Sequence, residues 1–123
     1  MRFLLVAFIL INSALGFGQE AVFSVDKRLH KFPKTIEGPK VVHEYLVKNT
    51  GTSPLIITGY TVACNCTFVD LPGPIPPGGT GIVRVTFDTR GKYYQQDRSV
   101  ILATNGKKEM EQLRFKIFVV PKK

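Results

Sequence analysis

Two cysteines separated by a single residue hold most of the chemistry that this sequence offers. Cys64 and Cys66 lie in the run Thr61-Val-Ala-Cys-Asn-Cys-Thr-Phe68, and the chain of 123 residues has no other cysteine. In a regular strand, side chains two residues apart point to the same face, so the two sulfurs would lie side by side. Such a pair can form a disulfide, bind a soft metal ion or exchange with an external thiol.

A structural use is the first alternative: the pair forms a disulfide, or packs as two small apolar side chains at the end of a strand. In a fully extended chain the two Cα atoms lie about 7 Å apart, near the upper limit for a bridge. A disulfide therefore requires a bend at Asn65. A strained and exposed bridge would be reducible, which is the basis of the redox alternative.

Metal binding is the remaining alternative, because two thiolates on one face can bind a soft ion such as Cu(I). Cys64 and Cys66 do not complete a structural zinc site, which takes four ligands. The fold, or a second molecule, would have to supply a further ligand such as His30 or His43. His43 lies in an alternating apolar run, so we expect it to be a packed structural histidine.

No set of nucleophile, base and orienting residue is recognisable in the sequence, and we predict that the protein is not an enzyme. Asp70, Asp88 and Asp97 are interpreted as turn or loop residues. The glycines between Leu71 and Gly79 lie among prolines with no helical pattern after them, which excludes a phosphate-binding loop.

The first residues have the pattern of a secretory signal peptide. Met1-Arg2 is positively charged, Phe3 to Ile11 is an unbroken apolar run, and small residues follow, with cleavage expected after Gly16 or Gly18. A retained anchor is the alternative, but the run is short for a bilayer and no second one follows. We therefore expect a signal peptide over 1–18 and an exported domain over 19–123, periplasmic or secreted, with no transmembrane segment in the mature chain.

The basic charge is distributed along the whole chain. The sequence has 17 Lys and Arg against 9 Asp and Glu, a formal net charge of +8. A nucleic-acid-binding protein would concentrate this charge on one element with interleaved aromatic residues, so we expect no nucleic-acid partner. The charge indicates a solvated basic surface, with contact to anionic lipid headgroups or envelope polymers as a secondary alternative. We expect a monomer.

No segment shows a sustained helical period, and the apolar segments are short and separated by Gly, Pro and Asn turns. This pattern predicts an all-β fold, an immunoglobulin-like antiparallel two-sheet sandwich of about seven strands. Residues 92–98 are predicted to be a polar connecting stretch. The predicted strands cover residues 21–25, 29–36 (an edge strand at best, because of Pro33), 41–47, 54–62, 81–87, 99–104 and 112–120.

Alternation within two of these segments predicts which side chains face the core. The inward rows are predicted to be Val41, His43, Tyr45 and Val47 in one segment, and Leu113, Phe115, Ile117 and Val119 in the last. Gly59 is predicted to mark a bulge or bend. Asn105-Gly106 is the strongest hairpin signal in the sequence.

Several separate motifs, in this order, resemble the bacterial domain of unknown function 1573, or DUF1573, an immunoglobulin-like exported domain similar to the ASPM, SPD-2 and Hydin type. They are Val47-Lys-Asn-Thr-Gly51, Pro54-Leu-Ile-Ile57, Cys64-Asn-Cys-Thr67, Pro74-Ile-Pro-Pro-Gly78, Val85-Thr-Phe-Asp88 and Thr104-Asn105. Members of this family commonly have Ser-Cys-Gly-Cys-Thr at the cysteine element, where this chain has Asn65 in place of the glycine. The resemblance implies a fold and an exported location but no activity.

These observations favour an exported immunoglobulin-like module, a non-catalytic binding or structural protein of the bacterial cell envelope. It would act through an edge strand or a loop face on an envelope protein or glycan, without a cofactor. The candidate binding residues are Cys64, Asn65, Cys66 and Thr67. The alternative function is a small copper-binding or thiol redox protein that uses Cys64 and Cys66, with a copper ion as its cofactor.

Overall fold

The structure is a computed structural model that describes residues 19–123. The predicted signal peptide, residues 1–18, lies outside the described residues. The regular secondary structure of residues 19–123 consists of β-strands. These residues include no helix long and apolar enough to cross a membrane. The nine strands are β1 Phe23–Val25, β2 Leu29–Lys31, β3 Thr35–Ile36, β4 Lys40–Asn49, β5 Ile57–Val62, β6 Thr67–Asp70, β7 Thr80–Asp88, β8 Tyr94–Thr104 and β9 Met110–Val120.

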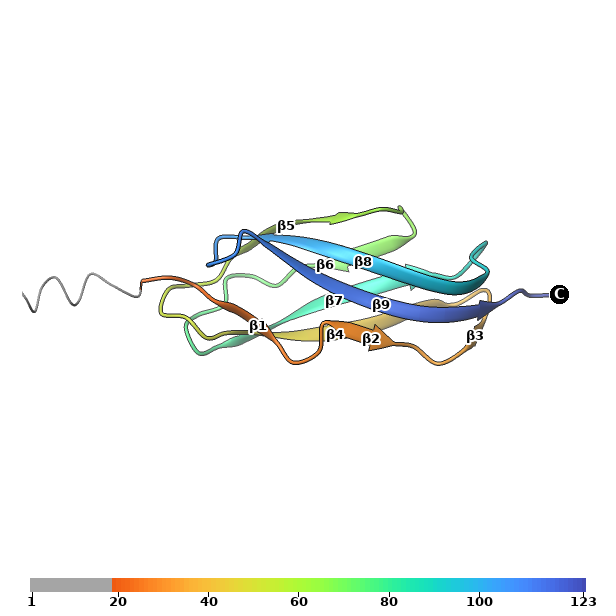
Figure 1. Ribbon diagram of the computed structural model, residues 1–123, viewed down its shortest axis with the longest axis horizontal. Coiled ribbons are helices and arrows are strands. Elements are labelled where there is room, and N and C mark those ends of the chain that lie inside the picture. The colour runs from red at the N-terminus through yellow and green to blue at the C-terminus, as the bar shows by residue number, and fades with distance from the viewer. Residues whose placement is uncertain (1–18) are drawn as a thin grey trace, which may run out of the picture.

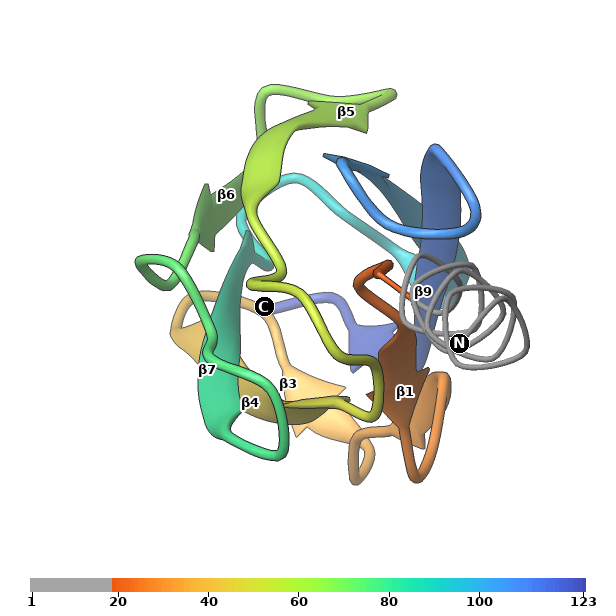
Figure 2. The same cartoon turned by 90° about the vertical axis from the view of Figure 1, so that its left-hand side faces the viewer.

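The strands form two facing sheets, which confirms the predicted sandwich (Figures 1 and 2). One sheet has the order β1-β4-β7-β6, and the other has the order β2-β9-β8-β5, with β3 also paired to β9. Most pairs are antiparallel, but β2 and β3 run parallel to β9. Two strands more than expected are present, because the predicted edge strand is divided around Pro33 and because β6 was not predicted.

The core forms where the inward rows of the two sheets meet. Tyr45 and Val47 of β4 are buried, and Leu113, Phe115, Ile117 and Val119 of β9 are each no more than 1% exposed, as their alternation predicted. The ring of Phe115 on β9 contacts the rings of Phe87 on β7 and of Phe32, at centroid distances of 5.3 and 5.8 Å. Phe115 therefore links the two sheets and the segment after β2.

Two buried polar side chains connect segments that apolar packing alone would not hold in register. The Tyr45 hydroxyl donates a hydrogen bond of 2.6 Å to the carbonyl of Arg114, from one sheet to the other, and burial raises the pKa of this tyrosine. Asn49 accepts hydrogen bonds from the N–H groups of Val22 and Gly51. Its amide also donates to the carbonyls of Ser53 and Ile75. These hydrogen bonds give the buried polar atoms of Tyr45 and Asn49 the partners that buried polar groups require.

The prediction for residues 92–98 is wrong, because β8 begins at Tyr94 and pairs with β9 over this stretch. Asp97, interpreted as a turn residue, lies opposite Lys116 in the ladder. Polar residues on both faces hide the alternation that usually marks a strand, while the backbone still pairs with β9. Tyr94 has a φ of 66°, the left-handed region that few residues other than glycine adopt.

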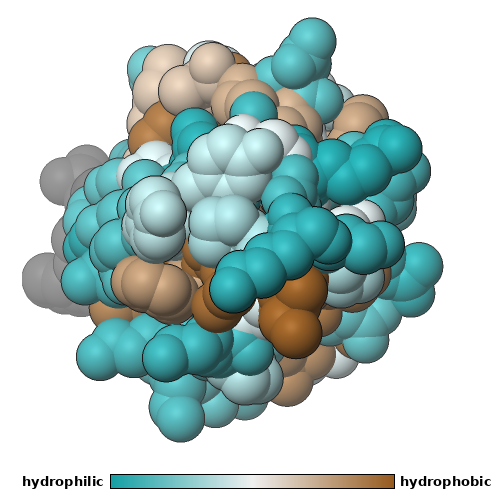
Figure 3. All heavy atoms as spheres, turned by 90° about the vertical axis from the view of Figure 1, so that its right-hand side faces the viewer, coloured by the Kyte–Doolittle hydropathy of each residue, from teal (hydrophilic) through white to brown (hydrophobic). Residues whose placement is uncertain are grey.

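The predicted irregularities occur where expected. The pairing of β5 with β8 shifts register between Ile57 and Gly59, which confirms the bulge. Asn105-Gly106 begins the connection between β8 and β9, closed by a hydrogen bond from the N–H of Thr104 to the carbonyl of Glu109. At the end of the sandwich from which the C-terminus leaves, hydrophobic patches lie among a mainly hydrophilic surface (Figure 3).

Candidate functional site

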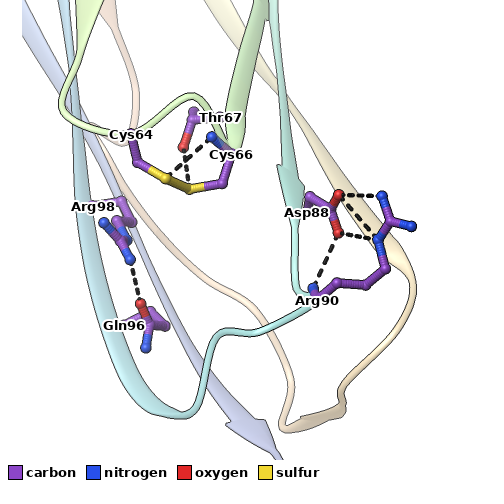
Figure 4. The surroundings of a disulfide bond; sticks show 7 residues. All are labelled: Cys64, Cys66, Thr67, Asp88, Arg90, Gln96 and Arg98. Atoms are coloured by element: carbon purple, nitrogen blue, oxygen red, sulfur yellow. Dashed lines mark hydrogen bonds and ion pairs between the residues drawn. A yellow bond between two sulfur atoms is a disulfide. The ribbon is translucent and has the colours of Figure 1, made fainter.

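Cys64 and Cys66 form a disulfide in the turn that joins β5 of one sheet to β6 of the other (Figure 4). Their Cα atoms lie 5.1 Å apart, so the chain is bent at this point rather than extended. Among residues 19–123 only Tyr94 combines a side chain with a positive φ, so Asn65 needs no glycine-like backbone. Asparagine in place of the glycine is therefore compatible with the bridge.

One backbone hydrogen bond attaches the cysteine turn to the end of β7, and a second closes the turn itself. The N–H of Asp88 donates to the carbonyl of Cys66 at 2.9 Å, and the N–H of Thr67 donates to the carbonyl of Cys64 at 3.2 Å. The N–H of Cys66 also lies 3.1 Å from the sulfur of Cys64. Thr67 is buried, the two cysteines are half-buried and Asn65 is exposed. Of the four predicted binding residues, Asn65 is thus the one most accessible to a partner.

Two arginines and an aspartate lie beside the disulfide, and each arginine is hydrogen-bonded to a neighbouring side chain (Figure 4). Arg98 donates to the side-chain oxygen of Gln96 at 2.6 Å, and its guanidinium lies 5.6 Å from the ring centroid of Phe87. Arg90 hydrogen-bonds to Asp88 and lowers the pKa of that carboxyl group. The Nε of Arg98 is buried and has no hydrogen-bond partner within the described chain. The hydrogen bonds of the two arginine side chains thus go to Gln96 and Asp88 and not to the turn itself.

The two histidines come together elsewhere in the fold. The rings of His30 on β2 and His43 on β4 stack with their centroids 3.6 Å apart and an angle of 7° between their planes. The strand β2 is at one edge of its sheet, and β5, which leads into the cysteines, is at the opposite edge. Across residues 19–123 no three His, Cys, Asp or Glu side chains are grouped to hold a metal ion. The copper alternative gains no third ligand from this fold.

The histidine pair packs among aromatic side chains, as expected for His43. Phe32 contacts His30 and Tyr45 contacts His43 edge-on, at centroid distances of 4.5 and 4.6 Å. Burial lowers the pKa of His30, and the charge of Lys27 lowers it further. Burial and the neighbouring His30 lower the pKa of His43, while Glu44 acts in the opposite direction. Both rings are therefore stable in this position as neutral imidazoles.

The free edge of β5 is a candidate binding feature that the sequence analysis did not single out. Within the described residues β5 pairs with β8 on one side and with no strand on the other (Figure 2). From Asn49 to Val69 the sequence contains no Asp, Glu, Lys or Arg, although charged residues make up 21% of the chain. The uncharged run is the sequence signal that could have identified this edge.

The other edges carry the residues that usually prevent strand pairing. The strand β1 is followed by Asp26-Lys-Arg28, β2 ends at Lys31 with Pro33 close behind, and β6 has only four residues and ends at Asp70. On β5, by contrast, Tyr60 lies opposite the fully buried Leu102 but is itself 45% exposed. Its ring is on the core side of the sheet, and it stays accessible because, within residues 19–123, no strand pairs with the outer edge of β5.

Replacing both Cys64 and Cys66 by serine is expected to lower the free energy of unfolding by about 1–2 kcal/mol. The closed loop contains one intervening residue, and the entropy that a disulfide removes from the unfolded chain grows with loop length. Urea denaturation of the variant measures the loss. Wild-type protein treated with dithiothreitol is the control and is expected to lose the same amount. A loss above about 4 kcal/mol, or failure to fold, would contradict this account of the bridge.

The free energy of unfolding is expected to fall as the pH drops below about 6.5, the ordinary pKa of histidine. Because both imidazoles have a lower pKa in the folded protein, the unfolded chain binds more protons in this range, and stability is lost as the folded pKa values are approached. Urea denaturation between pH 7.5 and 5 tests this. The variant His30→Phe/His43→Phe should show a shallower decline, and an identical decline in both proteins would refute it.

Comparisons with solved structures agree with the observed fold. The chain is similar to a protein of unknown function from Porphyromonas gingivalis W83, with a TM-score of 0.72, 15% identity and coverage of 82% of this chain and 48% of that one. It is also similar to the ASH / PapD-like domain 7 of human CEP192, with a TM-score of 0.63, 15% identity and coverage of 85% and 89%. A third neighbour is WR4, a C. elegans MSP family member, with a TM-score of 0.51, 13% identity and coverage of 80% and 97%.

These likenesses show the fold alone, because the identities are low. The chain spans about half the length of the P. gingivalis protein, 48%. No curated protein matches the chain. The family model of DUF1573, described as a protein of unknown function, matches residues 23–119, from the first residue of β1 to the last but one of β9. The chain therefore belongs to the DUF1573 family.

Proposed function

We propose that the protein is an exported, non-catalytic binding module of the cell envelope that captures an extended segment of a partner protein along β5. The observation that carries this proposal is the free, uncharged edge of β5 in a protein that is otherwise strongly basic. An exposed edge strand presents unpaired N–H and C=O groups to which a peptide can add as a further strand.

The geometry of β5 suits such an addition. Alternate residues of an edge strand direct their backbone groups outward, so a partner strand would form a ladder of hydrogen bonds with β5. Tyr60 lies on the core side of the sheet and is half-exposed, and Val62 packs partly against the core. An added strand would cover both side chains. Main-chain bonds would then supply affinity, and contacts with these side chains would supply specificity.

The disulfide has a positioning role in this proposal. The cysteine turn begins directly after β5 and is bonded to β7 of the opposite sheet, so it holds the end of the edge strand in place. Asn65 is exposed at the tip of the turn and would contact the end of the bound segment. Cys64, Cys66 and the buried Thr67 keep that tip in position, which accounts for all four residues of the predicted site without a metal or a thiol reaction.

Export is supported by the sequence pattern of residues 1–18. The substitution Leu5→Arg places a charge in the apolar run and is expected to keep the protein uncut in the cytosol, whereas Leu5→Ile should be exported normally. Cell fractionation followed by N-terminal sequencing measures this, with the mature chain expected to start after Gly16 or Gly18. Wild-type protein found in the cytosol with its initial methionine would contradict export, and uncut protein in the membrane would favour a retained anchor.

Charges introduced on β5 are expected to prevent strand addition. The double variant Gly59→Lys/Thr61→Lys should weaken binding of an extended peptide at least tenfold, because lysines on an edge disfavour pairing. A Cβ at Gly59 meets no atom within 4 Å and Thr61 is exposed, so both changes fit the fold. The probe is the tightest binder from a library of eight-residue peptides with alternating apolar residues, and calorimetry measures its affinity.

The matched control adds the same two charges to the middle of the same sheet. Ser99→Lys/Gln112→Lys changes exposed residues of β8 and β9 and should leave peptide affinity within about twofold of wild type. Two N-methylated forms of the peptide would be compared, one methylated at the odd-numbered nitrogens and the other at the even-numbered ones. Only one of them should lose binding, since only one set of N–H groups faces β5. Equal binding by both double variants, or insensitivity to N-methylation, would rule out strand addition at β5.

A further inference from the structure

A groove on the outer face of the second sheet combines aromatic rings with lysine side chains. It has a volume of about 380 Å³ and lies between the end of β2, the start of β8 and the end of β9. This volume is within the range of pockets that hold small ligands or a few units of a polymer. Its main lining residues are Lys31, Phe32, Gln95, Asp97, Lys116 and Phe118.

Exposed aromatic rings border the groove at the start of β8. Tyr94 is 60% exposed and its ring lies 6.0 Å from that of Phe118, which is itself 37% exposed. Tyr93 is also exposed and contacts Tyr94 at 6.5 Å. The same end of the sandwich shows hydrophobic patches between hydrophilic side chains (Figure 3). Flat apolar surfaces of this kind suit a ligand with flat apolar faces of its own.

The charges in the groove favour an anion that also carries hydroxyl groups. Lys31, which lines the groove, and Lys34, which lies beside it, form no ion pair with any described residue. Lys116 is 4.0 Å from Asp97, whose closer partner is Arg114 at 2.7 Å. The ammonium of Lys34 lies 5.4 Å from the centroid of the Phe118 ring. Cations are therefore available to carboxylates, while Asp97 offers acceptor oxygens to hydroxyl donors.

The backbone of Tyr94 supports a role for its ring. A left-handed φ of 66° is unfavourable for a tyrosine, by about 1 kcal/mol or more, and a glycine would adopt it freely. Strained residues of this kind persist where the surrounding structure holds them, and they cluster at functional sites. At this position, where a glycine would be the relaxed choice, the chain has a tyrosine whose exposed ring lies beside Phe118.

We propose that this groove binds a carboxylate-bearing glycan. The apolar faces of the sugar rings would pack on Tyr94 and Phe118, the carboxylates would pair with Lys31 and Lys116, and sugar hydroxyls would donate to Asp97. DNA fits less well, because its sugars lack the free hydroxyl groups that would donate to Asp97. An acidic peptide fits less well because it lacks the hydroxyl groups.

This site is separate from the β5 edge and does not depend on it. In the sheet order β2-β9-β8-β5 the groove lies toward the β2 side, while strand addition would occur at the opposite edge. A glycan and a protein segment could then be bound at the same time. The module would connect an envelope protein to an acidic polysaccharide.

Calorimetric titration of the purified protein with defined oligosaccharides tests the proposal. Oligogalacturonate and a soluble glycan strand with N-acetylmuramic acid are the two acidic probes, and chitohexaose of similar length is the neutral one. We expect at least one acidic probe to bind at least tenfold more tightly than chitohexaose, with an affinity that falls as salt is raised. Which acidic probe binds identifies the source of the carboxylate. Binding of neither, or tighter binding of oligothymidylate or hexaglutamate, would overturn the proposal.

Two sets of variants locate the binding site. Tyr94→Gly removes the ring and relieves the backbone, so its melting temperature should equal or exceed that of wild type while binding of the acidic glycan falls at least tenfold. The double variant Lys31→Gln/Lys116→Gln should bind the acidic glycan at least tenfold more weakly than wild type, and its affinity should depend much less on salt concentration. The controls Tyr60→Ala and Lys48→Gln/Lys107→Gln lie outside the groove and should bind like wild type. Wild-type affinity in a folded Tyr94→Gly variant would refute the assignment.

Discussion

The packing of the Phe115 ring between the two sheets is the interaction on which the rest of the structure depends. Phe87 meets it from the opposite sheet and Phe32 from the segment after β2, and Phe87 and Phe115 are fully buried. Replacing a fully buried phenylalanine by alanine typically lowers the free energy of unfolding by about 3–5 kcal/mol. Because the segment from β2 to β3 is drawn onto β9 by these contacts, one side of the sandwich is closed.

Closure of that side determines where the accessible features lie. The strands β2 and β3 cover one edge of the second sheet, so β5 remains as its exposed edge, and the disulfide turn crosses from β5 to the first sheet. The same closure places the end of β2 beside β9, and these two strands together with the start of β8 form the groove around Lys31 and Lys116. Both proposed binding surfaces therefore follow from the way in which one short edge segment packs. The cysteines, the most reactive groups in the sequence, hold the geometry of one of them.

Much of the fold could be predicted because the relevant signals are local. The inward row from Leu113 to Val119, the bulge at Gly59 and the turn at Asn105-Gly106 each depend on a few neighbouring residues. The strand β6 was missed because it has four residues, of which only Thr67 and Val69 face the core. The start of β8 was missed because its Gln, Asp and Arg residues are polar on both faces, and its pairing with β9 is a long-range interaction that periodicity does not report.

The sequence by itself determined the class of fold and the inward faces of the long strands β4 and β9, because alternation and turn chemistry act over a few residues. Only the tertiary structure decided which distant residues meet. It stacked His30 on His43, bonded the cysteine turn to β7, and brought Lys31 and Lys116 to one groove. The physical reason is that such contacts depend on which strands share a sheet. That order is set by the burial of the whole core, and no local pattern encodes it.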